Sequence, residues 1–347
     1  MTNIAPINIL AYKLVKQDGY GRYVLHTMRA LHRLGVPFMP GTIDVLEQPA
    51  WVSRLAGWDF SRLTLSAMPA HEAKPVGGRQ WLLTMWEDDS LPTQMPNTQN
   101  GNWADQMNRL ASRVIVPCEH NKEVFERRGV RVPVDVVHGG TCPTEFPLIP
   151  YVQRETYTFL ALGDRGARKG IETAYQAFFK AFPTERDVRL IIKMRDLKEP
   201  VYALKNSFAS DDRISFWIDD IDHMGDVFAQ ADCVLYPAYG DGWGMFPREA
   251  AMSGLPVICT NWSGTAVGIE HWAYPLNKLQ MKRSMLPSQN GYWAVPQLDE
   301  VVERMRYCYE HRAEARAFGE KARAWLVENQ TWGHSAMQLK ALLEKHG

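Results

Sequence analysis

Two carboxylates, Asp241 and Glu249, flank a glycine-rich turn and are separated by seven residues. An apolar run precedes the turn, and the pattern after it predicts a short helix and then a buried strand at 255–260. A strand, a turn, a helix and a second strand form a βαβ unit. Because free backbone N–H groups gather where such a helix begins, the turn suits a bound anion. The residues expected to face that anion are Gly242, Trp243, Gly244, Met245 and Phe246.

A cluster of positive charge is expected beside a second helix start. The stretch 163–170 follows an apolar run and contains Arg165, Arg168 and Lys169 between glycines. Taken alone, such a cluster is also typical of a solvated basic surface patch. Arginine suits bidentate contact with a phosphate, whereas lysine supplies a point charge. The residues alone therefore leave two interpretations open, a phosphate site and a solvated patch.

Repeated strand–helix units fill both halves of the chain. In the first half, strands are expected at 7–12, 59–66, 79–86 and 113–118, with a further strand and turn at 132–140 and helices at 20–34, 103–112 and 118–128. In the second half, strands are expected at 157–163, 188–194, 213–218 and 233–238, and helices at 167–182, 224–231, 297–315, 317–328 and 335–346. The stretch 141–155 has three prolines and no period, which is typical of a linker. The sequence predicts an α/β protein with two parallel sheets.

The composition excludes several classes of protein. The 347 residues include 39 Lys and Arg and 39 Asp and Glu, so no overall basic field favours nucleic-acid binding. The five cysteines form no C-x-x-C pair, and no metal-ligand spacing is present. The N-terminus lacks the pattern of a signal peptide, and no apolar run reaches the ~20 residues of a membrane span. We expect a cytoplasmic protein with reduced thiols and no bound metal. Four tryptophans fall in or beside predicted loops, where their aromatic faces could stack on sugars: Trp86, Trp103, Trp243 and Trp262.

The turn and the basic cluster resemble the donor-site motifs of retaining GT-B glycosyltransferases, the large family of glycogen synthase-like and mannosyltransferase-like enzymes (glycosyl transferases group 1). That family has two glutamates separated by seven residues, with Gly-Phe-Gly after the first. Here Asp241 replaces the first glutamate and Trp243 replaces the phenylalanine. Lys169-Gly170 matches the family's Lys-Gly pair, and Cys118 and His138 stand in stretches similar to its N-terminal domain.

The resemblance implies the GT-B fold, which is two Rossmann-like parallel-sheet domains facing a central cleft. Residues 1–145 would form an acceptor-side domain, and residues 156–325 would form the domain that binds the nucleotide sugar. Residues 326–347 would contain a helix that crosses back to the first domain.

The resemblance also assigns roles to residues. Arg168, Lys169, Asp241 and Glu249 would be the catalytic set: the cations hold the donor diphosphate, Asp241 faces the donor sugar, and Glu249 accepts the ribose hydroxyls. Further donor contacts would come from Gly19, Gly21, Arg165, Trp217 and Ile218, the last two next to the base. The family's arginine usually follows the first glycine directly, where this chain has Asp164, so the choice between Arg165 and Arg168 as the phosphate ligand stays open. The acceptor side would include Trp86, Glu87 and His138, whereas a catalytic base is not assigned.

The activity that the resemblance implies is a retaining, metal-independent transfer of a sugar to an acceptor hydroxyl. The donor would be a UDP- or GDP-sugar used as co-substrate, with no further cofactor. The acceptor class stays open among glycan, lipid, protein, small molecule and modified nucleic acid, as does the oligomeric state. Two alternatives remain. One is a catalytically degenerate GT-B protein that only binds a nucleotide sugar, and the other is a GT-B nucleotide-sugar epimerase.

Overall fold

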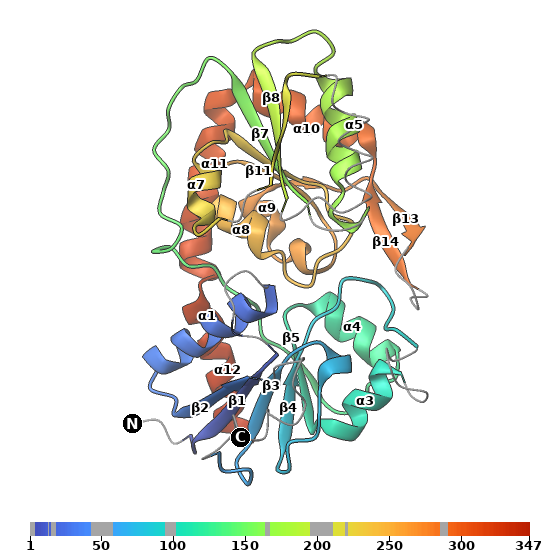
Figure 1. Cartoon of the computed structure of the whole chain (residues 1–347), viewed down its shortest axis with the longest axis vertical. Helices are drawn as coiled ribbons and strands as arrows, with labels where there is room; N and C mark the ends of the chain where they lie inside the picture. Colours follow the sequence, from blue (N-terminus) through green and yellow to red (C-terminus); the bar gives the residue numbers. More distant parts are fainter. Residues whose placement is uncertain are drawn as a thin grey trace. The chain divides into compact units, whose positions relative to one another are not determined.

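The chain divides into two compact units. The computed structural model describes residues 4–12, 14, 19–42, 58–93, 102–163, 167–194, 211–218, 221–284 and 291–347. The first unit comprises Met1–Gly140, Leu286–Gly291 and Gln330–Gly347, and the second comprises Thr141–Met285 and Tyr292–Asn329. Each unit is built on its own six-stranded sheet with helices on both faces (Figure 1). The expected α/β class with two parallel sheets is confirmed.

The sheet of the first unit has the strand order β2-β1-β3-β4-β5-β6, and all neighbouring strands are parallel. The strands β1, β3 and β4 are buried along their whole length, as expected where helices cover both faces. Their bounds are β1 Ile7–Ala11, β2 Phe38–Thr42, β3 Thr64–Ala67, β4 Gln80–Leu83, β5 Arg113–Val116 and β6 Val134–Val136.

Two pairs of helices cover this sheet (Figure 1). On one face, α3 (Trp103–Leu110) and α4 (Glu119–Arg127) share a core with Leu10 and Val114. On the other face lie α1 (Gly19–Arg33) and α12 (Trp332–His346), which contact each other through aromatic rings. The ring of Tyr23 meets Trp332 edge-on, with centroids 4.8 Å apart. The last helix is thus part of the first unit.

The sheet of the second unit has the strand order β12-β11-β10-β7-β8-β9, again with parallel neighbours. One face carries α5 and α10, and the other carries α7, α8, α9 and α11 (Figure 1). The strands are β7 Tyr157–Leu162, β8 Val188–Lys193, β9 Ile214–Trp217, β10 Cys233–Tyr236, β11 Val257–Thr260 and β12 Tyr274–Leu276. The helices are α5 Ile171–Ala181, α7 Met224–Phe228, α8 Met245–Met252, α9 Ile269–Trp272, α10 Leu298–Glu310 and α11 Arg312–Asn329.

Short elements complete both units. The 3-10 helix η1 (Ala70–Glu72) follows β3 in the first unit. In the second unit, η2 (Ala167–Lys169) follows β7, and η3 (Ser263–Ala266) follows β11. The strands β13 (Leu279–Arg283) and β14 (Tyr292–Pro296) form an antiparallel pair. The N–H group of Ala294 in β14 donates to the Tyr239 carbonyl at 3.0 Å, so this pair lies against the loop after β10.

The sequence patterns missed one strand of the first sheet and misplaced another. β2 was not expected, because Pro40 and Gly41 disfavour a strand interior. The structure places β2 at the edge of the sheet, where only β1 pairs with it, and a proline is tolerated there. The strand expected at 59–66 is wrong in its bounds: residues 60–62 form a turn, and β3 begins at Thr64.

The stretch predicted as a linker, 141–155, packs on the second unit. Phe146 is buried in the core shared by α8 and α11. The N–H group of Ile149 donates to the Ser253 carbonyl at 3.0 Å, and the Arg323 guanidinium donates to the Phe146 carbonyl at 2.7 Å. The prolines remove the regular period, but these bonds fix the chain to α8 and α11. The second unit therefore begins at Thr141 rather than after the proline-rich stretch.

Candidate active site

The candidate site lies where the strand order of the second sheet reverses. From β7 the chain proceeds to β8 on one side, and from β10 it proceeds to β11 on the other side. The loops that leave the carboxyl ends of β7 and β10 therefore diverge, and ligands of open α/β sheets bind at such a point. One loop carries Arg168 and Lys169, and the other carries the glycine-rich turn from Gly240 to Gly244.

A glycine brings the basic loop against the end of β10. Gly170 adopts a left-handed conformation with φ +67°, and a Cβ atom there would lie 2.1 Å from the Pro237 carbonyl oxygen. Only glycine allows this approach. It also divides the helix expected at 167–182 into η2 and α5. The Arg168 guanidinium then donates to the Gly240 carbonyl at 2.8 Å, and the Tyr239 N–H donates to the Arg168 carbonyl at 2.7 Å.

Lys169 and Asp241 form an ion pair at the centre of the site. The Lys169 ammonium lies 2.6 Å from Asp241 Oδ2, and both side chains are largely buried. The Tyr236 hydroxyl lies 2.5 Å from each of these two groups. Burial alone would raise the pKa of Asp241, but the charges of Lys169 and Arg168 outweigh it, so this pKa lies well below the ordinary value. Burial, and then the Asp241 charge, raises the pKa of Tyr236 well above its usual range.

The second oxygen of the Asp241 carboxylate holds the turn. Asp241 Oδ1 accepts the N–H group of Gly244 at 3.0 Å and, more weakly, that of Trp243 at 3.4 Å. Ser263 in η3 completes the arrangement, since its hydroxyl donates to the Asp241 carbonyl at 2.8 Å and accepts the Asp241 N–H at 3.0 Å. Ser263 has φ 54°, which is uncommon for a residue with a side chain. Asp241 thus organises the turn as well as pairing with Lys169.

Arg248 fastens the glycine turn to η3 from within the core. Its side chain has no exposed surface, and its guanidinium lies between Trp243 and Trp272, with centroid distances of 3.9 and 4.5 Å. It donates to the carbonyls of Trp243, Gly244, Gly264 and Val267. The ring of Trp243 is therefore packed against Arg248, and we correct the expectation that it could stack on a sugar. Donor contacts from this residue would have to come from its backbone.

The helix after the turn carries the second carboxylate. Gly244 precedes α8 with φ +77°, and a Cβ atom there would lie 2.6 Å from the Thr265 methyl carbon. Met245 and Phe246 form the first turn of α8, and Phe246 packs on Tyr236 with ring centroids 5.7 Å apart. Glu249 lies one turn into α8 and is only 4 % exposed. A carboxylate so buried needs polar partners to offset its desolvation.

The neighbouring strand ends add three further residues at the same edge of the sheet. Trp217 ends β9, with Ile218 next to it, and both are half-buried. Lys193 ends β8, between β7 and β9, and is 6 % exposed, with its ammonium donating to the Met194 carbonyl at 2.7 Å. The sequence analysis did not select Lys193, because it reads as the end of an apolar strand. Arg165 falls outside the described residues.

The predicted residues of the first unit are held by separate contacts. Gly19 and Gly21 lie in the first turn of α1 on either side of Tyr20. The Tyr20 hydroxyl donates to the Met85 carbonyl and accepts the Met85 N–H, both at 3.1 Å. This pair of bonds ties the start of α1 to the segment that follows β4.

Trp86 and Glu87 belong to that same segment. Asn121 in α4 holds the Trp86 backbone from both sides, accepting its N–H at 3.0 Å and donating to its carbonyl at 2.7 Å. The Trp86 ring is 9 % exposed and packs on Trp103, with centroids 4.6 Å apart. The expectation that Trp86 and Trp103 present aromatic faces is thus corrected: both rings are core. Glu87 is half-buried.

His138 follows β6 and pairs with the first residue of α4. Its Nε2 atom lies 3.1 Å from Glu119 Oε1, and its backbone N–H donates to Gln338 in α12 at 2.9 Å. Cys118 precedes α4 and makes no side-chain capping bond, as expected from a thiol in place of a serine hydroxyl.

Comparison with protein families identifies the chain. Residues 119–339 match the family described as "Family 4 Glycosyltransferase in conflict systems", which covers more than half of the sequence. The chain belongs to this family. The expectation of a glycosyltransferase is therefore confirmed. A search of curated proteins found no match.

Solved structures similar to this glycosyltransferase share its whole architecture. They include HepE of Anabaena in complex with UDP and glucose, which is 14% identical with a TM-score of 0.69, covering 97% of this chain and 98% of that one. A sucrose-phosphate synthase of Thermosynechococcus elongatus is 15% identical, with a TM-score of 0.71 and 98% of each chain covered. WaaG, a glycosyltransferase involved in lipopolysaccharide biosynthesis, is 16% identical, with a TM-score of 0.69, covering 98% of this chain and 100% of that one. These likenesses confirm the GT-B fold.

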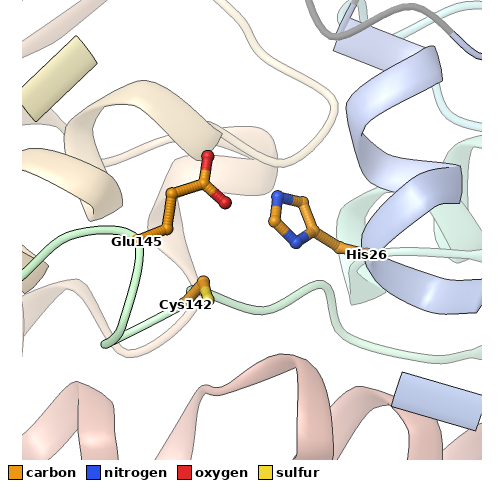
Figure 2. Close-up of side chains that lie close together, drawn as sticks. All are labelled: His26, Cys142 and Glu145. Atoms are coloured by element: carbon orange, nitrogen blue, oxygen red, sulfur yellow. The ribbon is translucent and has the colours of Figure 1, made fainter. Parts of the chain in front are cut away.

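Three residues of types that bind metal ions lie close together: His26, Cys142 and Glu145. Figure 2 shows His26 on α1 and, on the segment after Thr141, Cys142 and Glu145. His26 belongs to the first unit, where its ring stacks on Trp332 at 5.1 Å. Cys142 and Glu145 belong to the second, so we infer no metal site from the three.

In the part of the chain that the structure describes, no helix is both long and apolar enough to cross a bilayer.

Proposed function

We propose that this glycosyltransferase transfers a sugar from a UDP- or GDP-sugar to an acceptor hydroxyl, with retention of configuration and without a metal ion. The observation that carries the proposal is the position of Lys169. Its ammonium is fixed at the reversal point of the second sheet, beside Arg168 and the start of α8. A diphosphate bound there would meet two cations and the N–H groups of a helix start, which is the environment that stabilises a leaving phosphate.

In the proposed step, the bond between the sugar C1 atom and the diphosphate oxygen breaks. Its electron pair stays on the diphosphate, where Lys169 and Arg168 stabilise the added charge. The oxygen of the acceptor hydroxyl forms the new bond to C1 on the same face, and its proton passes to the departing phosphate. Glu249 accepts the ribose hydroxyls of the donor, and Trp217 and Ile218 lie near its base. This assignment needs no base from the protein.

The structural neighbours support the choice of donor. HepE has been solved with UDP and glucose and also with UDP-glucose. We propose a nucleotide sugar as the donor of this chain as well, because the two proteins share the fold over nearly the whole chain. The acceptor stays open among glycan, lipid, protein, small molecule and modified nucleic acid. The five cysteines are all free thiols, which supports a cytoplasmic site of action.

Turnover of radiolabelled UDP- and GDP-sugars, with water and with pooled acceptors, tests the proposal. Release of nucleoside diphosphate with labelled sugar on the acceptor supports it, and the anomeric configuration of the product tests retention. A changed sugar released from the donor alone would instead identify an epimerase. Saturable binding of donor without any turnover would identify a degenerate binding protein.

Metal independence has its own test. Because Lys169 and Arg168 supply positive charge at the phosphate position, turnover should persist in excess EDTA. Complete loss of turnover, restored by Mg²⁺ or Mn²⁺, would contradict this part of the proposal while leaving the transfer itself intact.

A further inference from the structure

Tyr236 is a buried polar side chain to which neither the sequence patterns nor the proposed transfer step assigns a role. It is the last residue of β10 and is 1 % exposed. Its hydroxyl lies 2.5 Å from Lys169 Nζ and 2.5 Å from Asp241 Oδ2. The Lys169 ammonium also lies 5.2 Å from the centroid of the Tyr236 ring. Tyr236 thus contacts both members of the central ion pair.

The direction of these two hydrogen bonds follows from the chemistry of the groups. An ammonium only donates and a carboxylate only accepts, so the hydroxyl must accept from Lys169 and donate to Asp241. The raised pKa of Tyr236, caused by burial and then by the Asp241 charge, keeps the hydroxyl protonated for this donation. The three groups close a ring of hydrogen bonds in which every contact has one defined donor.

We propose that Tyr236 is a positioning residue that, with Asp241, holds the Lys169 ammonium where the donor diphosphate binds. The role of Lys169 in this inference rests on the proposed function. A lysine has a long, flexible side chain, and fixing it costs conformational entropy. Tyr236 and Asp241 already hold the Lys169 ammonium before the donor binds. The free energy of donor binding therefore need not offset this loss of entropy.

The geometry also accounts for aspartate in place of the glutamate of the resembling motif. Asp241 Oδ2 receives Lys169 and Tyr236, while Oδ1 receives the Gly244 N–H at 3.0 Å. Both oxygens are thus engaged inside the turn. A carboxylate on a side chain longer by one methylene would be displaced from this position. Asp241 therefore acts through Lys169 and the turn rather than by contact with the donor sugar.

A labelling experiment tests whether Tyr236 holds the Lys169 ammonium, without any assumption about catalysis. Lys169 and the exposed reference Lys180 are labelled with an amine-reactive reagent, and both are quantified by mass spectrometry in the wild type and in Tyr236→Phe. We expect Lys169 to be labelled at least threefold faster in the variant, with Lys180 unchanged. An equal rate at Lys169 in the two proteins would overturn the proposal. This result stands whether or not the chain transfers a sugar.

Asp241→Asn supplies a second labelling arm should Tyr236→Phe fail to fold. It removes the charge partner and leaves the tyrosine hydroxyl in place. Labelling of Lys169 should then lie between the wild-type rate and that of Lys180, because the hydroxyl still accepts from the ammonium. A rate equal to that of Lys180 would show that Tyr236 does not hold Lys169.

Donor kinetics test the consequence for catalysis. Tyr236→Phe should lower kcat/KM by about 10- to 150-fold, the effect of losing the charge-assisted hydrogen bond to the Lys169 ammonium. In a Lys169→Ala background the same change should have less than a threefold effect, because Tyr236 acts through Lys169. Equal effects in both backgrounds would make Tyr236 a merely structural residue. Tyr239→Phe is the matched control, since that hydroxyl contacts Thr173 Oγ1 at 2.7 Å instead.

Discussion

In the second unit, Lys169, Asp241 and the glycine turn are bonded to one another, whereas Trp86 and His138 of the first unit are bonded to different parts of their scaffold. Lys169, Asp241 and the glycine turn share one network of contacts under 3.1 Å. In the first unit, Trp86 is held by Asn121, and His138 pairs with Glu119. A preorganised network is the property expected of a site that stabilises charge, and it is the reason that the proposed function assigns the donor chemistry to the second unit.

Removal of Lys169 should have the largest effect. Lys169→Ala should lower donor kcat/KM by about 100- to 1000-fold, because the leaving phosphate loses a fixed cation. Steady-state kinetics with the best donor of the screen measure it. The variant also leaves Asp241 without its partner, so its thermal unfolding should be recorded in parallel. If the variant folds and its donor kcat/KM falls by less than threefold, Lys169 is not part of the site. The difference proposed between the two units would then also be wrong.

Glu249 should come next. Glu249→Gln keeps the shape of the side chain but removes the charge that would hold the ribose hydroxyls. We expect kcat/KM for the donor to fall by roughly 10- to 150-fold, which corresponds to a lost charged hydrogen bond. Binding of the free nucleoside diphosphate, measured by calorimetry, should weaken in proportion. Unchanged binding together with unchanged kinetics would place Glu249 in the core rather than in the site.

The ion pair at Asp241 predicts a pH dependence of stability. The pKa of Asp241 is lowered in the folded state, so its contribution is complete well above the unfolded-state pKa, about 3.9, and is lost as pH falls through that value toward the folded pKa. Between pH 5 and 3, wild-type stability should fall more steeply than that of Asp241→Asn, by up to about 1.4 kcal/mol per pH unit. Urea unfolding at several pH values measures both slopes. Parallel slopes would mean that the carboxylate is not held as described.

The smallest effect should come from the first unit. His138→Gln removes the imidazole that pairs with Glu119 and should change donor affinity by less than threefold, since Glu119 is itself exposed. The same calorimetric titration used for Glu249 provides the comparison. A large loss of donor affinity would show that both units contribute to donor binding, which contradicts the difference proposed between them.

Most strands and helices of the second unit could be predicted from the sequence. The motifs that mark its loops lie close in sequence to the strands that position them. The turn from Gly242 to Gly244 and the Lys169-Gly170 pair stand next to the strands that position them, so short motifs were sufficient. Tyr236 and Lys193 were missed because each ends an apolar strand and reads as core. Their importance depends on which strands are neighbours, and the order β10-β7-β8 is a non-local property.

The first unit was less predictable for a related reason. β2 was not predicted because Pro40 disfavours a strand interior. Its place at the sheet edge depends on pairing with β1. The aromatic residues Trp86 and Trp103 were expected at the surface because they stand in or beside polar stretches. They are buried because Trp103, the first residue of α3, packs on Trp86 in a core that includes residues of α4, and only the packing of distant segments decides this.

The packing of Arg248 restricts which residues homologues can have at positions 243 and 248. A guanidinium enclosed by Trp243 and Trp272 cannot be lost singly without leaving four carbonyls to find new donors. Replacement of Trp243 by phenylalanine would likewise uncover one face of a buried cation. The two positions should therefore covary among homologues: tryptophan at 243 should accompany arginine at 248, and phenylalanine at 243 should accompany an apolar residue there.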